Sequence, residues 1–130
     1  MSCNTNVLIV EADNTSASQI EEYIKNEGYK VVSVASNGMA ALQALSSFSI
    51  DLAIIDYGLP DSWSETVMHA LRKKQLTAPI VLLGKPGIGK PNQLRLKNNR
   101  AFYLPRPFSR SELLETAAKA VKTNCAHTNS

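Results

Sequence analysis

The sequence predicts an α/β domain with a parallel sheet covered by helices on both faces. Five short apolar runs, rich in β-branched or aromatic residues, occur along the chain: VLIV (7–10), KVVSV (30–34), LAII (52–55), IVLL (80–83) and AFYL (101–104). Such runs are typical of strands buried on both faces. Segments with a helical spacing of apolar residues lie between them, and this alternation favours right-handed crossovers between parallel strands.

Four helical segments are predicted from apolar residues three or four positions apart. These residues are Ile20, Tyr23 and Ile24; Met39, Leu42 and Leu45; Val67, Met68 and Leu71; and Leu113, Leu114, Ala117 and Val121. The third and fourth segments begin with the patterns Ser62-x-x-Glu65 and Ser109-x-x-Glu112. Both patterns fit a capping box, in which the Ser oxygen and the Glu carboxylate each accept a hydrogen bond from an otherwise unpaired backbone N–H.

The stretch from 85 to 99, KPGIGKPNQLRLKNN, interrupts the alternation. Its two Pro, two Gly and three Asn predict a loop with at most a short helix around Pro91 to Lys97. The preceding Gly84 extends its first part to GKPGIGK (84–90), which fits the spacing of a nucleotide-binding P-loop. Such a loop continues with Ser or Thr, whereas Pro91 has neither a hydroxyl nor an N–H. Nucleotide binding is therefore not expected.

Length and composition predict one domain over residues 5–123, followed by a disordered polar tail over 124–130. Of the 130 residues, 44% are hydrophobic and 19% are charged, as in ordinary globular proteins. The apolar runs are too short to cross a bilayer, and the N-terminus has no secretory signal pattern. Cys3 and Cys125 lie in polar terminal segments, so we expect a cytoplasmic protein without a membrane partner.

Basic residues concentrate in one part of the chain. Residues 85–110 contain no Asp or Glu and seven Lys or Arg: Lys85, Lys90, Arg95, Lys97, Arg100, Arg106 and Arg110. A basic surface formed by this segment would suit an acidic protein partner or a phosphate. DNA binding is not expected, because no recognition-helix pattern accompanies these charges.

Acidic side chains end two of the predicted strand segments. Glu11 follows VLIV, and Asp56 follows LAII. Because open parallel sheets bind ligands outside the carboxyl ends of their strands, we expect these two carboxylates to be neighbours in a polar site. Mg²⁺ takes oxygen ligands, and Glu11, Asp56 and the backbone carbonyl of Gly58 can supply three.

From about Val7 to Val121 the chain resembles the receiver domain of two-component response regulators. The matching stretches are VLIVE, NEGYKVVSVASNGMAAL (26–42), DLAIIDYGLP, PIVLL, and YLPRPF followed by SELL. The resemblance implies a flavodoxin-like fold with strand order 2-1-3-4-5. It also implies an Asp phosphorylated by a sensor histidine kinase or a phosphotransfer protein, Mg²⁺ as the cofactor, and a protein partner at the face of the fourth and fifth strands.

The resemblance assigns roles to individual residues. Asp56 is the phosphoacceptor, and Glu11 and the Gly58 carbonyl are the Mg²⁺ ligands beside it. Tyr103 occupies the position of an aromatic side chain that reorients when the acceptor is modified. The expected switch and partner face is formed by Tyr103, Lys85, Lys90 and Pro107.

The site departs from the family pattern, so the resemblance implies an atypical, partly degenerate phosphorylation site. Ala12 stands where a second acidic residue is usual, and Asp13 is expected to begin the next helix, so Mg²⁺ binding should be weak or absent. Gly84 replaces a hydroxyl residue that donates to the phosphoryl group. Arg106 replaces a Lys, and its guanidinium fork either pairs with phosphoryl oxygens or binds Asp56 directly.

Two further positions carry open alternatives. Trp63 and Ser64 replace an Asp-Gly pair that is usual after the acceptor loop, and Trp63 either caps the pocket or packs on the third helix. His69 lies in an apparent helix, where a surface or packing role is expected and a phosphotransfer role is not.

Two functions fit these observations. The first is a receiver in phosphorelay signalling, with Asp56 as acceptor and Arg106 beside the phosphoryl group. The second is a phosphorylation-independent pseudo-receiver that binds a protein partner through its basic face, residues 84–110. In both cases we expect a signalling module, not an enzyme, that is monomeric or weakly dimeric.

Overall fold

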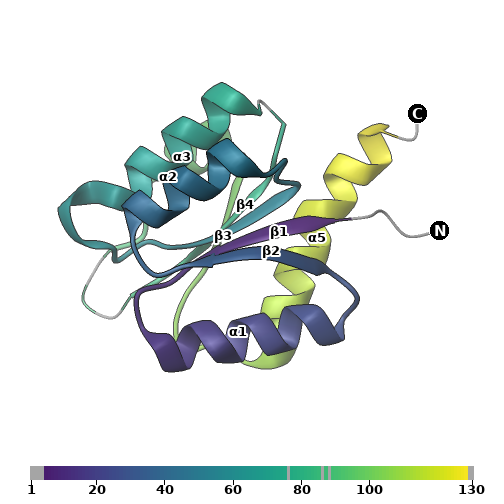
Figure 1. The fold of residues 1–130 in the computed structure, drawn as a ribbon, viewed down its shortest axis with the longest axis horizontal. Coiled ribbons are helices and arrows are strands. Elements are labelled where there is room, and N and C mark those ends of the chain that lie inside the picture. The colour runs from purple at the N-terminus through teal and green to yellow at the C-terminus, as the bar shows by residue number, and fades with distance from the viewer. Residues whose placement is uncertain (1–4, 76, 86, 88, 129–130) are drawn as a thin grey trace.

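The computed structural model describes residues 5–75, 77–85, 87 and 89–128, without the side chains of residues 95 and 123–128 (Figure 1). The elements alternate along the chain: β1 (Asn6–Val10), α1 (Asn14–Asn26), β2 (Lys30–Ala35), α2 (Gly38–Ser47), β3 (Leu52–Asp56), η1 (Pro60–Ser62), α3 (Trp63–Lys74), β4 (Ile80–Leu83), α4 (Gln93–Asn98), β5 (Ala101–Leu104) and α5 (Arg110–Thr128). The five strands form one parallel sheet in the order β2-β1-β3-β4-β5. The predicted flavodoxin-like fold is confirmed.

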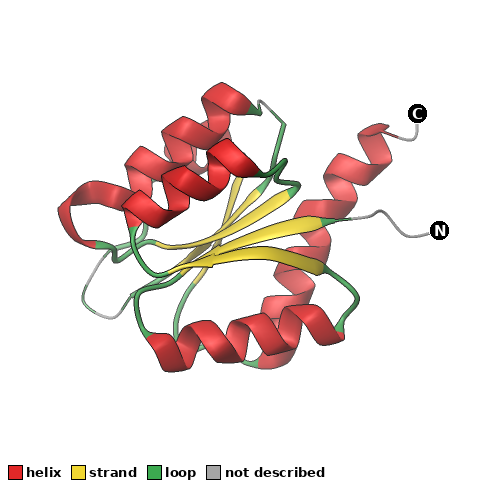
Figure 2. Cartoon of the chain, viewed as in Figure 1, coloured by secondary structure: helices red, strands yellow, loops and turns green. Residues whose placement is uncertain are grey.

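Helices cover both faces of the sheet, as predicted. Figure 2 shows the strands between two helical layers, and Figure 1 identifies α2 and α3 on one face and α1 and α5 on the other. Successive strand residues point to opposite layers. Leu8 and Val10 pack in the core with α2 and α3, whereas Val7 and Ile9 pack in the core with α1 and α5. Because β1 is buried on both faces, its residues 7–10 contain no polar position.

The first two helices begin at side-chain caps. The Oδ2 atom of Asp13 accepts a hydrogen bond from the N–H of Ser16 at 2.8 Å, at the start of α1. The Oδ1 atom of Asn37 accepts one from the N–H of Ala40 at 2.9 Å, at the start of α2. Each bond satisfies a backbone donor that has no partner within the helix. The prediction that Asp13 begins the helix after β1 is confirmed.

The two predicted capping boxes differ in outcome. At α5 the box is confirmed, because the N–H of Ser109 donates to Glu112 Oε1 at 2.8 Å and the N–H of Glu112 donates to Ser109 Oγ at 3.1 Å. At α3 the prediction is wrong, since Ser62 makes no capping hydrogen bond. An N-cap residue normally has an extended backbone. Asp61 and Ser62 instead have left-handed backbones, with φ of 57° and 59°.

The last two helices meet the predictions to different degrees. α4 lies where a short helix was expected. α5 continues to Thr128, past the predicted boundary at 123, so helix and not a tail occupies 124–128. No Gly or Pro interrupts the sequence from 110 to 128, which explains the extension. Residues 129 and 130 of the predicted tail lie outside the described residues.

Within the described part of the chain, no helix has the length and apolar character needed to cross a bilayer.

Candidate functional site

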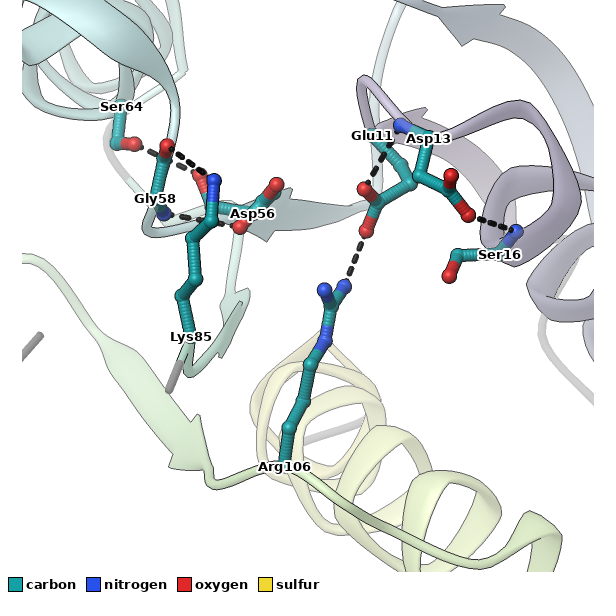
Figure 3. Close-up of polar contacts among 8 residues, drawn as sticks. All are labelled: Glu11, Asp13, Ser16, Asp56, Gly58, Ser64, Lys85 and Arg106. Carbon is teal, nitrogen blue, oxygen red and sulfur yellow. Dashed lines mark hydrogen bonds and ion pairs between the residues drawn. The ribbon is translucent and has the colours of Figure 1, made fainter. Parts of the chain in front are cut away.

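The strand register brings the two acidic residues together. β1 and β3 pair in parallel with Val10 opposite Ile55, so Glu11 and Asp56 follow at adjacent strand ends. β4 continues the same edge of the sheet, because Leu83 lies opposite Asp56. Figure 3 shows both carboxylates at this edge, as the sequence predicted for neighbouring strand ends.

Asp56 is held in place by its own loop and by α3. Its side chain is buried, with 3% of the residue exposed. Its Oδ1 atom accepts a hydrogen bond from the N–H of Gly58 at 2.8 Å, and its backbone carbonyl accepts one from the Ser64 hydroxyl at 2.7 Å. Among the described side chains, no cation forms an ion pair with Asp56. One oxygen of the Asp56 carboxylate is thus held by a hydrogen bond, and none of the described groups binds the other.

Arg106 pairs with Glu11 and not with Asp56. Its Nη2 atom contacts Oε1 of Glu11, which is 2% exposed, while the Arg106 side chain is 20% exposed. The other carboxylate oxygen of Glu11 accepts a hydrogen bond from the N–H of Asp13 at 3.1 Å. The alternative in which Arg106 binds Asp56 directly is therefore wrong. Arg106 comes from the loop before α5 and extends toward the end of β1, where it neutralises a buried carboxylate (Figure 3).

Asp13 is close in sequence to the acidic residues but serves the helix. The hydrogen bond from the backbone N–H of Ser16 lowers the pKa of the Asp13 carboxyl below its ordinary value, because it favours the charged form. The Asp13 carboxylate is exposed and points to the first turn of α1 (Figure 3). It therefore does not replace the acidic residue that is missing at Ala12.

The predicted Mg²⁺ ligands are close together, but their oxygens do not fit a divalent cation. Both oxygens of Glu11 already accept bonds, from Arg106 and from Asp13. The carbonyl of Gly58 accepts a hydrogen bond from Lys85 Nζ at 3.4 Å. No group of three or more His, Cys, Asp or Glu within the described part of the chain could hold a metal ion. The candidate ligands thus include two carboxylates, Glu11 and Asp56, and two side-chain cations, Arg106 and Lys85, lie beside them.

Tyr103 fills the space beside Gly84. A Cβ atom at position 84 would lie 2.5 Å from the Tyr103 hydroxyl and 3.1 Å from the Cα of Pro105. The first distance is shorter than real contacts and the second is tighter than most, so a Cβ atom at position 84 would push against Tyr103 in its inward position. Lys90 Nζ lies 6.0 Å from the centroid of the Tyr103 ring, at the limit of a cation–π contact. The structure therefore brings Gly84, Tyr103 and Lys90 together.

Three of the basic residues of segment 85–110 lie in different parts of the molecule. Lys85 contacts Gly58, whereas the Arg110 guanidinium lies 6.0 Å from the ring of Tyr23 on α1. Arg100 precedes β5 at the opposite end of the sheet, and its charge lowers the pKa of Arg72, although burial of Arg72 contributes more. These side chains thus point to different parts of the molecule. Lys85, Arg100 and Arg110 therefore do not form one basic face, whereas the sequence predicted a basic face over residues 84–110.

Pro107 lies apart from the other residues of the predicted partner face. It lines a cavity of about 410 Å³ between α1 and the start of α5, together with Ile20, Tyr23 and Phe108. Tyr103, Lys85 and Lys90 belong to β5 and to the loop after β4. Residues 86 and 88 of that loop, part of the P-loop-like motif, lie outside the described residues.

Sequence reasoning missed two contacts around the acceptor loop. Ser64 is 2% exposed and holds the backbone of Asp56, although the sequence marked it only as a departure from a pattern. Trp63 begins α3 and packs on α2, since a Cβ atom at Gly38 would lie 2.2 Å from its Cε3 atom. The glycine at the first position of α2 was the available signal for a bulky neighbour there.

Comparisons with known proteins agree with this geometry. A family model described as "Response regulator receiver domain" matches residues 7–118. Transcriptional regulatory protein CpxR of Escherichia coli is 33% identical over 108 residues, which cover 83% of this chain and 45% of CpxR. Transcriptional regulatory protein KdpE of Mycobacterium tuberculosis is 30% identical over 122 residues, covering 94% of this chain and 53% of KdpE. The chain spans about half the length of these curated relatives.

Solved structures support the same assignment. The receiver domain of a Francisella response regulator is 26% identical, with a TM-score of 0.78 and coverage of 93% of this chain and 99% of that one. A CheY-like receiver domain protein from Methanospirillum hungatei, 20% identical, has a TM-score of 0.83 over 96% of this chain and 99% of its own, and shows the fold alone. Since the family match covers most of the chain and the fold agrees, the chain is a receiver domain of the two-component response-regulator family.

Proposed function

We propose that this receiver domain is phosphorylated on Asp56 by a phosphohistidine of a sensor histidine kinase or phosphotransfer protein. Receiver domains interact with such proteins. The observation that carries the proposal is the state of Asp56, which is buried at the end of a central strand and makes no ion pair with a described cation. A carboxylate locked by Arg106 would be a poor nucleophile, whereas this one is oriented by the N–H of Gly58 alone.

The chemistry requires positioning and charge more than covalent help from other groups. An oxygen of Asp56 attacks the phosphorus, the phosphorus–nitrogen bond of the donor breaks, and the imidazole leaves. The Gly58 N–H holds Oδ1, which leaves the other oxygen for the attack. Arg106, held on Glu11 next to Asp56, is proposed to face the oxygens of the incoming phosphoryl group.

Receiver domains typically bind Mg²⁺ at an acidic site. For this chain we propose that binding is weak or absent, because Ala12 supplies no carboxylate and Glu11 already accepts two bonds. Losing a ligand or an outer partner commonly lowers metal affinity roughly 10- to 100-fold.

The proposed output is a change in affinity for a protein partner at the β4 and β5 ends, near Tyr103, Lys85 and Lys90. We propose a cytoplasmic signalling module and not a metabolic enzyme. The two curated relatives are named transcriptional regulatory proteins, but this chain matches only about half of each. The pseudo-receiver alternative is not favoured, because it relied on a basic face over residues 84–110, and Lys85, Arg100 and Arg110 lie in different parts of the molecule.

Intact-mass measurement after incubation with acetyl phosphate and Mg²⁺ tests the proposal. We expect the mass of one phosphoryl group to be added to the wild type and to Asp61→Asn, a control in the same loop. Asp56→Asn should gain nothing. If the wild type gains no mass with acetyl phosphate or with a phosphorylated phosphotransfer protein, or if Asp56→Asn gains as much, Asp56 is not the acceptor.

A further inference from the structure

Two side-chain cations contact the groups that the sequence assigned to a metal ion. Arg106 contacts the carboxylate of Glu11, and Lys85 donates to the carbonyl of Gly58 at 3.4 Å. Arg106 follows β5 and Lys85 follows β4, so they reach the acidic edge from separate loops. Both are at the carboxyl ends of the strands, where Asp56 also lies.

The sheet order places Asp56 between these cations. β3 lies between β1, which leads to Glu11, and β4, which leads to Lys85. Figure 3 shows the Lys85 side chain on one side of Asp56 and the Arg106–Glu11 pair on the other. A phosphoryl group on Asp56 would therefore have a positive charge on each side.

The stem of Lys85 is seated against the acceptor loop. A Cβ atom at Gly58 would lie 2.0 Å from the Cδ of Lys85 and 2.9 Å from its Cβ. The aliphatic chain thus crosses directly over Gly58, and a larger residue at 58 would displace it. The Lys85 residue is exposed, and its ammonium group has three donors, of which the long bond to Gly58 uses one. The remaining donors are available to an anion.

The two carboxylates at the strand ends have two side-chain cations beside them, and the exposed Asp13 carboxylate adds a further negative charge near Arg106. Glu11 and Asp56 bring two negative charges, and Arg106 and Lys85 bring two positive charges. A divalent cation entering here would be repelled by the two side-chain cations as well as attracted by the two carboxylates, whereas an incoming phosphoryl anion would find in Lys85 and Arg106 the positive charge that a metal ion would otherwise supply. This disagrees with the Mg²⁺ site implied by the family.

We infer that Lys85 and Arg106 act as built-in counter-cations, so that Asp56 accepts a phosphoryl group without a divalent metal ion. The inference rests on the proposed phosphorylation of Asp56. With acetyl phosphate, an Asp56 oxygen attacks the phosphorus, the bond from phosphorus to the acetyl oxygen breaks, and acetate leaves. No proton transfer or further reactant is needed. The ammonium of Lys85 contacts the transferring phosphoryl oxygens and stabilises their charge.

The test compares phosphorylation rates in EDTA and in Mg²⁺, followed by intact mass. The wild type should react at nearly the same rate in both solutions. Lys85→Met keeps the aliphatic stem but loses the charge, and its rate in EDTA should fall roughly 100-fold. Lys85→Arg should recover most of that loss. Lys73→Met, an exposed lysine near the end of α3, is the matched control and should behave as the wild type.

A second measurement does not depend on phosphorylation. Mg²⁺ titration of the unmodified protein, followed by calorimetry and by the fluorescence of Trp63, should give no saturable binding in the millimolar range. Saturable binding there would overturn the inference, as would phosphorylation of the wild type in Mg²⁺ but not in EDTA, and both results leave Asp56 as the acceptor. Absence of phosphorylation in both solutions would instead overturn the proposed function, and the inference with it.

Discussion

The carboxyl ends of β1 and β3 and those of β4 and β5 build the two sides of the site by different means. The acidic side, Glu11 and Asp56, consists of short side chains that are 2% and 3% exposed and whose places follow from strand register. The cationic side consists of Gly84, Lys85, Tyr103 and Arg106, where two long side chains extend from loops and an aromatic ring fills the space beside a glycine.

The two sides therefore contribute differently to the stability of the fold and to the chemistry of the site. The charges on the acidic side are buried and are held by the ion pair of Glu11 with Arg106 and by the hydrogen bond of Asp56 with the Gly58 N–H, so removing either partner costs folding free energy. Lys85 on the cationic side is exposed, so its removal should weaken the attraction of the site for an anion but change the free energy of unfolding little. Arg106 connects the two sides, because it is partly exposed yet neutralises buried Glu11.

Removing Arg106 should have the largest effect, because it leaves the Glu11 carboxylate buried and unpaired. We expect Arg106→Met to lower the free energy of unfolding by roughly 3 kcal/mol at neutral pH. Urea denaturation followed by Trp63 fluorescence measures this. Adding Glu11→Gln to Arg106→Met removes the unpaired charge and should restore part of the loss. A loss under about 1 kcal/mol, as at exposed ion pairs, would show that the two sides are not coupled in this way.

Adding a methyl group at Gly84 should have the next largest effect. Gly84→Ala forces its Cβ against the Tyr103 hydroxyl and the Pro105 backbone, and overpacking of this kind costs roughly 1–3 kcal/mol of unfolding free energy. In the Tyr103→Phe background the cost should shrink, because the nearest atom is gone. Gly89→Ala in the same loop is the control, since a Cβ there would meet nothing within 4 Å. Equal costs at 84 and 89 would contradict the inward position of Tyr103.

Removing the hydroxyl of Ser64 tests the support beneath the acidic side. Ser64→Ala leaves the backbone carbonyl of Asp56 buried without its donor and should lower the free energy of unfolding by about 1.5 kcal/mol. Thr66→Ala is the matched control on the same helix, because its hydroxyl donates to the Ser62 carbonyl at an exposed position. Chemical denaturation of both variants measures the difference. A control variant as unstable as Ser64→Ala would argue against a specific role for Ser64.

The smallest expected effect is the pH dependence of the α1 cap. The pKa of Asp13 in the folded protein lies below its ordinary value of 3.8, so its contribution to stability is complete above that pH and is lost as pH falls through the lowered pKa. The destabilisation caused by Asp13→Ala should therefore shrink in acid. Asn37→Ala removes the uncharged cap of α2 and should cost about 1 kcal/mol with little dependence on pH. Denaturation curves over a series of acid pH values would compare the two.

A pH-independent cost of Asp13→Ala would indicate that the Asp13 carboxylate does not titrate as a helix cap. A cost that depended on Mg²⁺ would place Asp13 on the acidic side after all. Either result would contradict the assignment of Asp13 to the first turn of α1 and not to the acidic side of the site.

Much of the fold was predictable because its signals are local. Burial of both faces of the central strands leaves uninterrupted apolar runs, and all five strands were predicted within one residue of their observed ends. The caps at Asp13 and Ser109 act within a few residues of their own helices. The cap at Ser62 failed because the loop after β3 imposes a left-handed backbone there, which side-chain spacing does not reveal.

The sequence by itself determined the alternation of elements and, through parallel strand ends, that Glu11 and Asp56 would be neighbours. Only the tertiary structure decided which carboxylate Arg106 neutralises, where Lys85 lies, and how the basic residues are dispersed. The physical reason is the length of the side chains and how freely their backbone places them. A strand's side chains alternate with a fixed period, whereas long cationic side chains on loops settle where distant segments provide a buried charge or a carbonyl to bind.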